Sequence, residues 1–308
     1  MHEQKNGSRS LFSSLCLLTA AVFWGTTFVA QSIAMDTLEP YIYNACRFLL
    51  GAVVLFPPAV LIGRRDPLSV NYRGSDPAAK KGPLLQGGIL CGLCLFFAGS
   101  FQQVGMQYTT AGKAGFITAL YIVLVPVFGL FLKRKCSPLI VPAVALAVVG
   151  FFFLCIKEGF SVGRGDAIVM CCSFVFAMHI LTVDHFSPRV DPVQLSCLQF
   201  LTAGLMSLIP AFLFETPHLA DILACWKPIA YAGILSSGVA YTLQIIGQRG
   251  LHPAVAALIM SLESVISALS GWLVLGDVLT KKEFLGCILV FAAVVLAQVP
   301  LPSAGQKK

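Results

Sequence analysis

The feature that most constrains this chain is a series of apolar runs, each about as long as a bilayer's hydrocarbon core is thick. A transmembrane helix needs about 20 apolar residues. By that rule the spans lie near residues 11–34, 40–62, 83–106, 110–132, 138–156, 166–183, 192–214, 227–248, 252–275 and 283–299. The sequence therefore predicts an all-α integral membrane protein with ten transmembrane helices.

The composition excludes soluble and nucleic-acid-binding classes. Only 11% of the 308 residues are charged, against about 25% in soluble domains, and the mean hydropathy is +0.84. A net charge of +7 is too dilute for a nucleic-acid footprint, so the lipid bilayer is an expected partner and nucleic acid is not. Most of the 11 cysteines lie in apolar runs, where cysteine packs as a small hydrophobe. The spacing of Cys91 and Cys94 therefore indicates packing rather than a metal or redox site.

The distribution of lysine and arginine predicts the orientation. With ten spans and the amino terminus inside, 14 basic residues fall in internal segments and 6 in external ones, and Arg47 remains within a span. Basic loops stay cytoplasmic, so we expect a multi-pass protein of the cytoplasmic (inner) membrane with both termini in the cytoplasm. In the second half the internal loops carry only Arg189 and Arg249, so the orientation depends on the first half and the tails.

The chain contains an internal repeat. A shift of 142 residues aligns Gln102 with Gln244 and gives nine identities over the 44 positions from 91 to 134, and a shift of 152 aligns Phe48 with Phe200. Five spans per repeat is an odd number, so the second repeat enters the membrane the opposite way up. Inverted repeats are typical of secondary transporters, whose substrate site lies near the midplane. The expected organisation is a cytoplasmic tail at 1–10, five-helix repeats at 11–156 and 166–299, a linker at 157–165, and a cytoplasmic tail at 300–308.

Four segments resemble a known family. AGKAGFITALYIVLVPVFGLFLKRK from Ala111 and AALIMSLESVISALSGWLVLGDVLT from Ala256 are similar to the fourth and ninth spans of EamA-type members of the drug/metabolite transporter superfamily. AAVFWGTTFVA from Ala20 and CRFLLGA from Cys46 also match the pattern. The resemblance implies ten helices in two five-helix repeats and the transport of small metabolites or drugs. One departure is the basic run that begins at Lys133, where the family usually has an acidic residue.

Glu263 is the candidate of most consequence, because it is a carboxylate deep inside a predicted span. A charge at that depth costs roughly 2.5–3.5 kcal/mol on insertion scales, which makes a functional role the default hypothesis. Two interpretations stay open. The residue is either a proton-coupling or substrate-amine site, or a neutral, hydrogen-bonded acid of the core.

Other polar and aromatic side chains within spans are candidates to line a substrate cavity, with helix packing and hydrogen bonding between helices as the alternative. These candidates are Trp24, Thr27, Gln103, Tyr121, His179, Tyr241 and Gln244. Arg47 and Lys113 are expected to be charged gates or interface anchors. Arg47, about seven residues inside its span, can extend its charge to the interface.

The sequence shows no catalytic constellation, metal-binding spacing or phosphate-binding loop, so we expect neither enzyme activity nor a cofactor or metal. It predicts a secondary transporter, a permease or exporter, that moves a small organic metabolite by alternating access, with amino acids and drug-like compounds as candidates. Without an ATP site, the energy must come from a solute gradient, exchange or proton coupling. The alternatives are a passive channel, a membrane-embedded enzyme and a nucleotide-sugar exchanger, and the oligomeric state stays open.

Overall fold

Long apolar helices make up the structure. The computed structural model describes residues 2–64, 77–109, 111–133, 137–155, 163–275 and 280–299. Lipid offers no hydrogen-bond partners, so a spanning backbone must satisfy its polar groups within helices or closed barrels. No strand occurs in these ranges. Seven helical segments are long and apolar enough to cross a membrane, and shorter apolar helices cover 117–131 and 140–153.

Each predicted span coincides with helical structure. The helices of the first half are α1 (His2–Met35), α2 (Pro40–Arg64), α3 (Pro77–Met106), α4 (Ala111–Ala119), α5 (Tyr121–Phe131) and α6 (Ile140–Cys155). Those of the second half, with η denoting a π-helix, are α7 (Arg164–Phe186), α8 (Pro192–Phe214), α9 (Leu219–Ala224), α10 (Trp226–Ala230), η2 (Tyr231–Ala240), α11 (Tyr241–Gln248), α12 (Pro253–Met260), α13 (Leu262–Ser270), η3 (Gly271–Leu275) and α14 (Lys281–Gln298).

Three predicted spans are not continuous α-helices. The fourth is divided into α4 and α5 at Leu120, and the ninth into α12 and α13 at Ser261. The eighth runs through α10, η2 and α11. Hydropathy does not register such breaks, because the apolar run continues through them.

The expected segment boundaries differ at the ends of the chain. Helix α1 begins at His2, so the polar segment expected as a tail is helical from residue 2 onward. Most of the expected linker at 157–165 and all of the tail at 300–308 lie outside the described residues.

Side-chain caps set several helix ends. The Asp191 carboxylate accepts hydrogen bonds from the backbone N–H groups of Val193 and Gln194 at the start of α8. Thr280 and Glu283 form a reciprocal capping box at the start of α14. Such caps satisfy N–H groups that have no partner in the first helical turn, and both lie in gaps between predicted spans.

One cap joins the two halves of the chain. Glu215, at the end of α8, accepts hydrogen bonds from the backbone N–H groups of Tyr41 and Ile42, each at 2.7 Å. Glu39 in turn accepts from the Thr216 N–H at 3.0 Å. The loop before α2 and the loop after α8 therefore hold each other in place.

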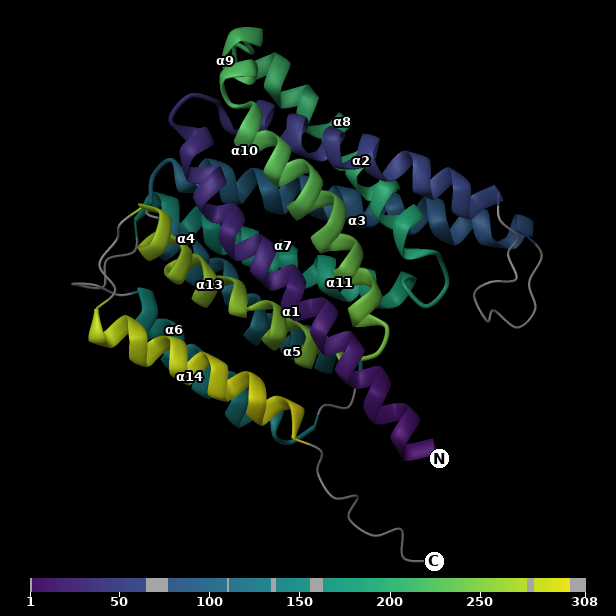
Figure 1. Cartoon of the computed structure of the whole chain (residues 1–308), viewed down its shortest axis with the longest axis vertical. Coiled ribbons are helices and arrows are strands. Elements are labelled where there is room, and N and C mark those ends of the chain that lie inside the picture. The colour runs from purple at the N-terminus through teal and green to yellow at the C-terminus, as the bar shows by residue number, and fades with distance from the viewer. Residues whose placement is uncertain are drawn as a thin grey trace, which may run out of the picture.

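The helices of the two halves interleave. Helix α2 packs against α8, and α6 packs against α14, which lies beside it at one edge of the molecule in Figure 1. Helix α3 packs against α7, and the equivalent contact in the other half joins η2 and α11 to α1. Each contact thus has a counterpart, as expected of two related halves around a pseudo-twofold axis.

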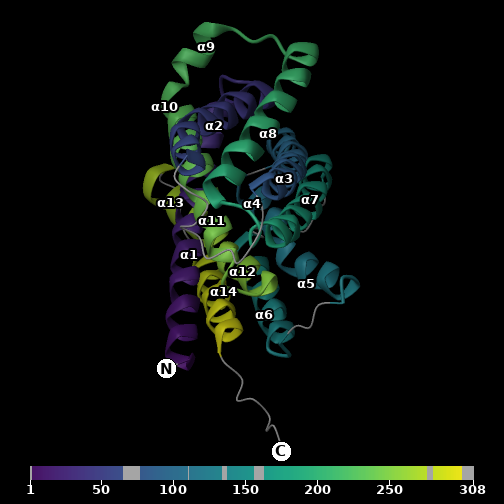
Figure 2. The same ribbon diagram turned by 90° about the vertical axis from the view of Figure 1, so that its right-hand side faces the viewer.

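The first half of α1 lies beside the end of α14. The Ser14 hydroxyl of α1 donates a hydrogen bond to the Gln298 side chain at the end of α14, at 3.1 Å. Figure 2 shows the start of α1 and the end of α14 at the same end of the molecule. A membrane chain that ends on the face where it began crosses an even number of times, which agrees with ten passes.

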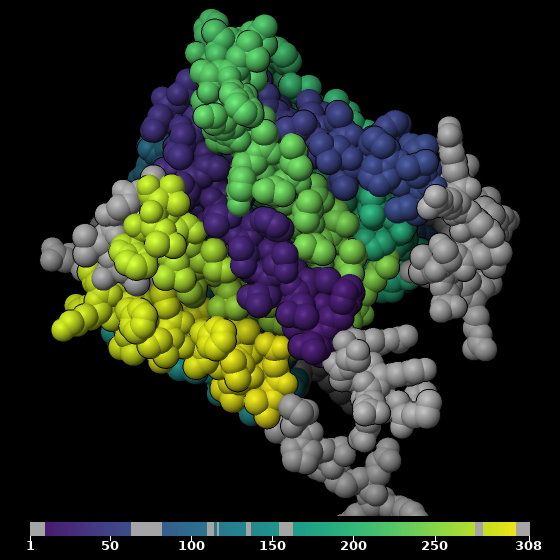
Figure 3. Space-filling view, in the orientation of Figure 1, coloured from purple at the N-terminus to yellow at the C-terminus, as the bar shows by residue number. Residues whose placement is uncertain are grey.

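Large apolar side chains cover the outer surface. Phe131, Phe212 and Leu273 are exposed to at least two thirds of their area, which in a membrane chain is contact with lipid. In the space-filling view α1 (purple) lies between the green helices of the eighth span and the yellow-green helices of the ninth (Figure 3). Many polar side chains within the spans, such as Thr27, Gln102 and Gln244, are buried inside the molecule.

Candidate functional site

A cavity lies between the two halves of the chain. The empty space between its lining atoms, part of which is open to the outside, is about 530 Å³. Its lining residues come from α1, α2, α3, α4, α5, α7, η2, α11, α12 and α13. They are Trp24, Thr27, Phe28, Gln31, Arg47, Gln102, Thr118, Tyr121, Phe176, His179, Ile180, Ser236, Tyr241, Gln244, Met260 and Glu263.

Most of the lining residues occupy equivalent positions of the internal repeat. At a shift of 152 the pairs are Trp24 with Phe176, Thr27 with His179, and Phe28 with Ile180. At a shift of 142 they are Gln102 with Gln244, Thr118 with Met260, and Tyr121 with Glu263. The cavity is therefore built around the pseudo-twofold axis, with the two halves contributing the same helix positions.

The helix breaks lie at the wall of this cavity. Leu120 directly precedes Tyr121, and Ser261 lies two residues before Glu263. At both breaks the backbone forms tighter i to i+3 hydrogen bonds, Leu120 C=O to Val123 N–H at 3.0 Å and Ser261 C=O to Ser264 N–H at 3.1 Å. Discontinuous helices that meet near the midplane are a common way in which transporters build solute sites.

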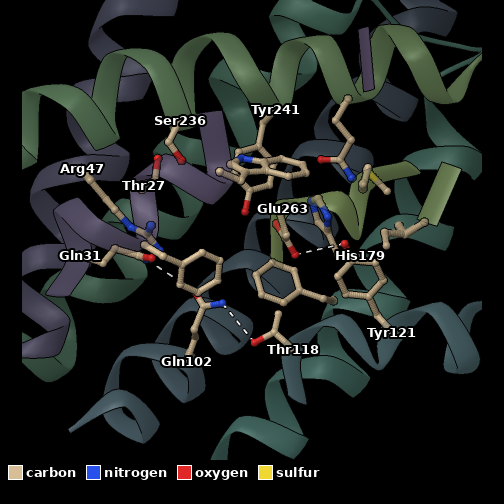
Figure 4. Close-up of a pocket in the computed structure, with 16 residues that line it drawn as sticks. Thr27, Gln31, Arg47, Gln102, Thr118, Tyr121, His179, Ser236, Tyr241 and Glu263 are labelled. Carbon is tan, nitrogen blue, oxygen red and sulfur yellow. Dashed lines mark hydrogen bonds between the residues drawn. The ribbon is translucent and has the colours of Figure 1, made fainter. Parts of the chain in front are cut away.

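Glu263 points into the cavity and bonds to its own repeat equivalent. Its carboxyl Oε1 accepts a hydrogen bond from the Tyr121 hydroxyl at 3.1 Å (Figure 4). Glu263 is 7% exposed and Tyr121 is 4% exposed. The carboxyl group thus has one protein donor, and it faces a space in which a solute or a proton carrier could approach it.

Tyr241 lies at the centre of an aromatic cluster on the opposite wall. Its ring centroid lies 4.7 Å from that of Trp24, 5.4 Å from that of Phe200 and 5.9 Å from that of His179. Such tilted and edge-on contacts are favourable arrangements for aromatic pairs. The cluster fixes one wall of the cavity with rigid, partly polar rings.

Three polar atoms on this wall lack hydrogen-bond partners among the described residues. They are Trp24 Nε1, His179 Nδ1 and Gln244 Oε1. The other ring nitrogen of His179 donates to Gln199 at 3.2 Å. Buried polar groups in native proteins are nearly always satisfied, and these three atoms are buried without a partner among the described residues.

A chain of side-chain amides and hydroxyls forms the wall near α1 and α3. Gln31 donates to Gln102 at 3.5 Å, and Gln102 donates to Thr118 at 3.4 Å. Gln103, expected to line the cavity, is not among its lining residues, and its side-chain amide donates to the sulfur of Met35. Adjacent helix positions point about 100° apart, so Gln102 faces the cavity in its place.

Arg47 also lines the cavity rather than extending to the interface. Its side chain is 5% exposed, and its Nε donates to the Asn44 side-chain oxygen at 3.0 Å. The guanidinium carbon lies 4.5 Å from the centre of the Phe48 ring and 5.5 Å from that of Tyr43. Figure 4 shows Arg47 at one end of the cavity with Gln31, and Glu263 away from it. The side chain of Lys113, the other expected gate or anchor, lies outside the described residues.

The described residues hold no group of three or more His, Cys, Asp or Glu side chains that could bind a metal. Cys91 and Cys94 are free cysteines in α3, and Cys91 is fully buried. The cavity is lined by polar and aromatic side chains.

Comparison with known proteins identifies the family. The model of the EamA-like transporter family matches residues 11–156 and again residues 163–298. The chain belongs to the EamA-like transporter family. The double match coincides with the internal repeat seen in the sequence.

Similar proteins cover almost the whole EamA-like chain. An uncharacterized transporter of Archaeoglobus fulgidus is 30% identical over 297 residues, which is 95% of this chain and 88% of that protein. The uncharacterized inner membrane transporter YedA of Escherichia coli is 24% identical, over 93% of this chain and 90% of that protein. A crystal structure of a protein with 19% sequence identity covers 93% of this chain and 96% of its own, with a TM-score of 0.73, and it shares the fold.

Sequence reasoning on this EamA-like chain missed some cavity residues that the repeat alignment could have found. Gln102 is aligned with Gln244 at a shift of 142, so the choice of one implies the other. Gln31 lies one helical turn after Thr27 and therefore on the same face. Ser236 left no comparable signal, because serine is common in packed membrane helices.

Proposed function

We propose that this EamA-like chain is a secondary transporter that moves a small organic solute across the cytoplasmic membrane by alternating access. The observation that carries the proposal is the cavity between the halves, lined by pairs of repeat-equivalent residues. Two related halves of opposite orientation can exchange conformations, so the same cavity opens first to one side and then to the other.

The proposed solute site consists of the cavity residues that combine polar atoms with aromatic walls. Trp24, Tyr241 and His179 present aromatic surface, and the partnerless atoms of this wall offer hydrogen bonds. Thr27, Gln102 and Gln244 add hydroxyl and amide groups. A pocket that is mostly apolar with a few convergent polar groups suits a small metabolite.

Glu263 is the proposed coupling group. It is the carboxyl group that lines the cavity, and its Tyr121 partner leaves acceptor positions free. Such a group can take a proton from one side and release it to the other when the cavity switches. It can also bind the amine of a solute in competition with the proton.

The proposed orientation places both termini in the cytoplasm. The support is the excess of lysine and arginine in the expected internal segments, 14 against 6. An exporter and an importer share this topology, and the direction follows from the gradients that the cell maintains.

The experiment that tests the proposal is solute flux in proteoliposomes that contain the purified full chain. Amino acids and related metabolites are screened with and without an imposed pH gradient, and protein-free liposomes serve as the background. A transporter gives saturable flux and exchange of labelled for unlabelled solute. Flux that rises linearly with concentration and shows no exchange indicates a channel and overturns the proposal.

A further inference from the structure

We propose that Arg47 binds the anionic group of the solute, so the cavity takes small organic molecules that carry a carboxylate. This inference rests on the cavity being the solute site, as proposed above. It adds the chemical class of the solute and the residue that selects it.

The first observation is that Arg47 is a buried cation without a counter-charge. No carboxylate among the described residues forms an ion pair with it, and its polar contact is the single hydrogen bond from Nε to Asn44. Its remaining neighbours are the faces of Tyr43 and Phe48. A buried charge is normally paired. The terminal nitrogens of this guanidinium have no anionic partner among the described residues, so an anion of the solute can supply one.

The second observation is that the fold reserves space for this guanidinium in one repeat only. Arg47 corresponds to Gln199 at a shift of 152, and Gly99 corresponds to Tyr241 at a shift of 142. A Cβ atom at Gly99 would lie 3.3 Å from Nη2 of Arg47, closer than most side-chain contacts. The second half thus has Gln199 and Tyr241 at the positions where the first half has Arg47 and the glycine that its guanidinium contacts.

The third observation is the position of the charge within the cavity. Arg47 shares its end of the cavity with Gln31, and Gln102 lies nearby on α3, whereas Glu263 lies apart from it (Figure 4). An arginine fork matches a carboxylate with two parallel hydrogen bonds. A solute carboxylate at Arg47 neutralises the buried cation and leaves the rest of the molecule to reach the Glu263 end.

The charge balance favours a carboxylate over a phosphate. Arg47 is the basic side chain among the cavity-lining residues with a fixed positive charge, and Glu263 is the acidic one. One guanidinium balances one negative charge. A doubly charged phosphate leaves an excess negative charge in a low-dielectric space that already contains a carboxyl group.

The test measures ligand-induced thermal stabilisation of the purified full chain in detergent. The probes are the common L-amino acids, compared with their carboxamides and with the corresponding amines, such as L-leucine, L-leucinamide and isopentylamine, together with inorganic phosphate. A ligand that binds the folded state raises Tm by an amount that grows with the logarithm of its concentration divided by its Kd. We expect at least one acid to stabilise the protein, its carboxamide and amine to bind about tenfold or more weakly, and phosphate to have no effect.

Variants assign the effect to Arg47. Arg47→Gln installs the side chain that the second repeat carries at the equivalent position, and it should lose the preference for acid over carboxamide. Arg47→Lys keeps the charge without the fork and should retain a weakened preference. The matched control is Arg189→Gln, which removes an exposed arginine outside the cavity and should keep the full preference.

The stability of the ligand-free protein separates binding from structure. A binding cation without a partner costs stability, so Arg47→Gln should be at least as stable as the parent chain when no ligand is present. A variant that fails to fold or melts well below the parent shows that Arg47 has a structural role, and the inference is then overturned.

Two further results overturn it. One is equal stabilisation of the parent by acid and carboxamide, and the other is the absence of stabilisation by any carboxylate probe, as expected if Glu263 moves to pair with Arg47. Saturable flux of a solute without a carboxylate contradicts this inference but leaves the proposed transport function intact. Absence of saturable flux for any solute counts against the transport function itself.

Discussion

The pairing of Tyr121 with Glu263 shows how single residues distinguish two otherwise related halves. Both side chains occupy the same repeat position, and they meet through one hydrogen bond across the pseudo-twofold axis. The acid is present in one half only. A chemical role that needs one carboxyl group in the cavity is therefore met without a second, repelling acid opposite it.

Replacement of this acid tests the coupling role. Glu263→Gln keeps shape and hydrogen bonding but carries no exchangeable charge, so we expect it to abolish proton-driven accumulation in proteoliposomes. Counterflow exchange of solute should survive, because exchange moves no net proton. Asp221→Asn, outside the cavity, is the matched control. Accumulation by Glu263→Gln equal to that of the parent means that the acid is structural.

Two glutamines in different surroundings, one in the cavity wall and one outside it, give a second residue-level test. Gln244 lines the cavity, whereas Gln103 is fully buried and bonds to Met35. Gln244→Ala should raise the apparent KM or abolish transport at normal protein abundance. Gln103→Ala should instead lower stability, by an interaction of about 0.6 kcal/mol on average, and leave transport per folded molecule unchanged. Transport assays normalised to folded protein, with thermal unfolding, check both, and the reverse pattern contradicts the assignment.

At the scale of helices, close backbone contact positions the broken ninth span against α1. A Cβ atom at Gly25 would lie 2.6 Å from the Glu263 carbonyl oxygen and 2.7 Å from Ile266. Only glycine permits this approach, which small residues provide throughout membrane helix interfaces. This contact between α1 and α13 holds the backbone of Glu263 in place, and with it the carboxyl group at the cavity.

A methyl group at this crossing should force the helices apart. We expect Gly25→Ala to reduce stability by about 1–3 kcal/mol, the usual cost of overpacking, and to impair transport. Gly129→Ala is the control, because its added Cβ has no atom within 4 Å. Thermal unfolding in detergent checks the difference, and equal melting of the two variants argues against a tight contact.

At the scale of the whole molecule, the hydropathy pattern predicts the positions of the spans because bilayer thickness alone dictates their length. The breaks at Leu120 and Ser261 escape this reasoning, since the apolar run continues through them and neither break has a proline at its position. The choice between Gln102 and Gln103 escapes it too, because helices surrounded by lipid and protein show no polar face from which to read the phase. The close approach of Arg47 to Gly99 escapes it as well, because only the packed structure shows it.

The orientation of the molecule is open to direct measurement. Reporter fusions within residues 70–80 and at the carboxyl terminus should both report a cytoplasmic location, because the basic excess lies there. A fusion after Glu215 should report the external side and serves as the internal control. An external location for residues 70–80 reverses the proposed orientation.

The unequal partners at equivalent positions have an energetic consequence. With two identical halves, the inward-open and outward-open forms would be related by a twofold rotation about an axis in the membrane plane, and the free-energy profile between them would be a double well of equal depths. Arg47 opposite Gln199, and Tyr121 opposite Glu263, remove that degeneracy. The two wells then differ in depth. Binding of an anion at Arg47 or protonation of Glu263 changes the free-energy difference between the two conformations. Under the proposed exchange, the resting state of the empty carrier thus depends on cavity residues that differ between the two halves.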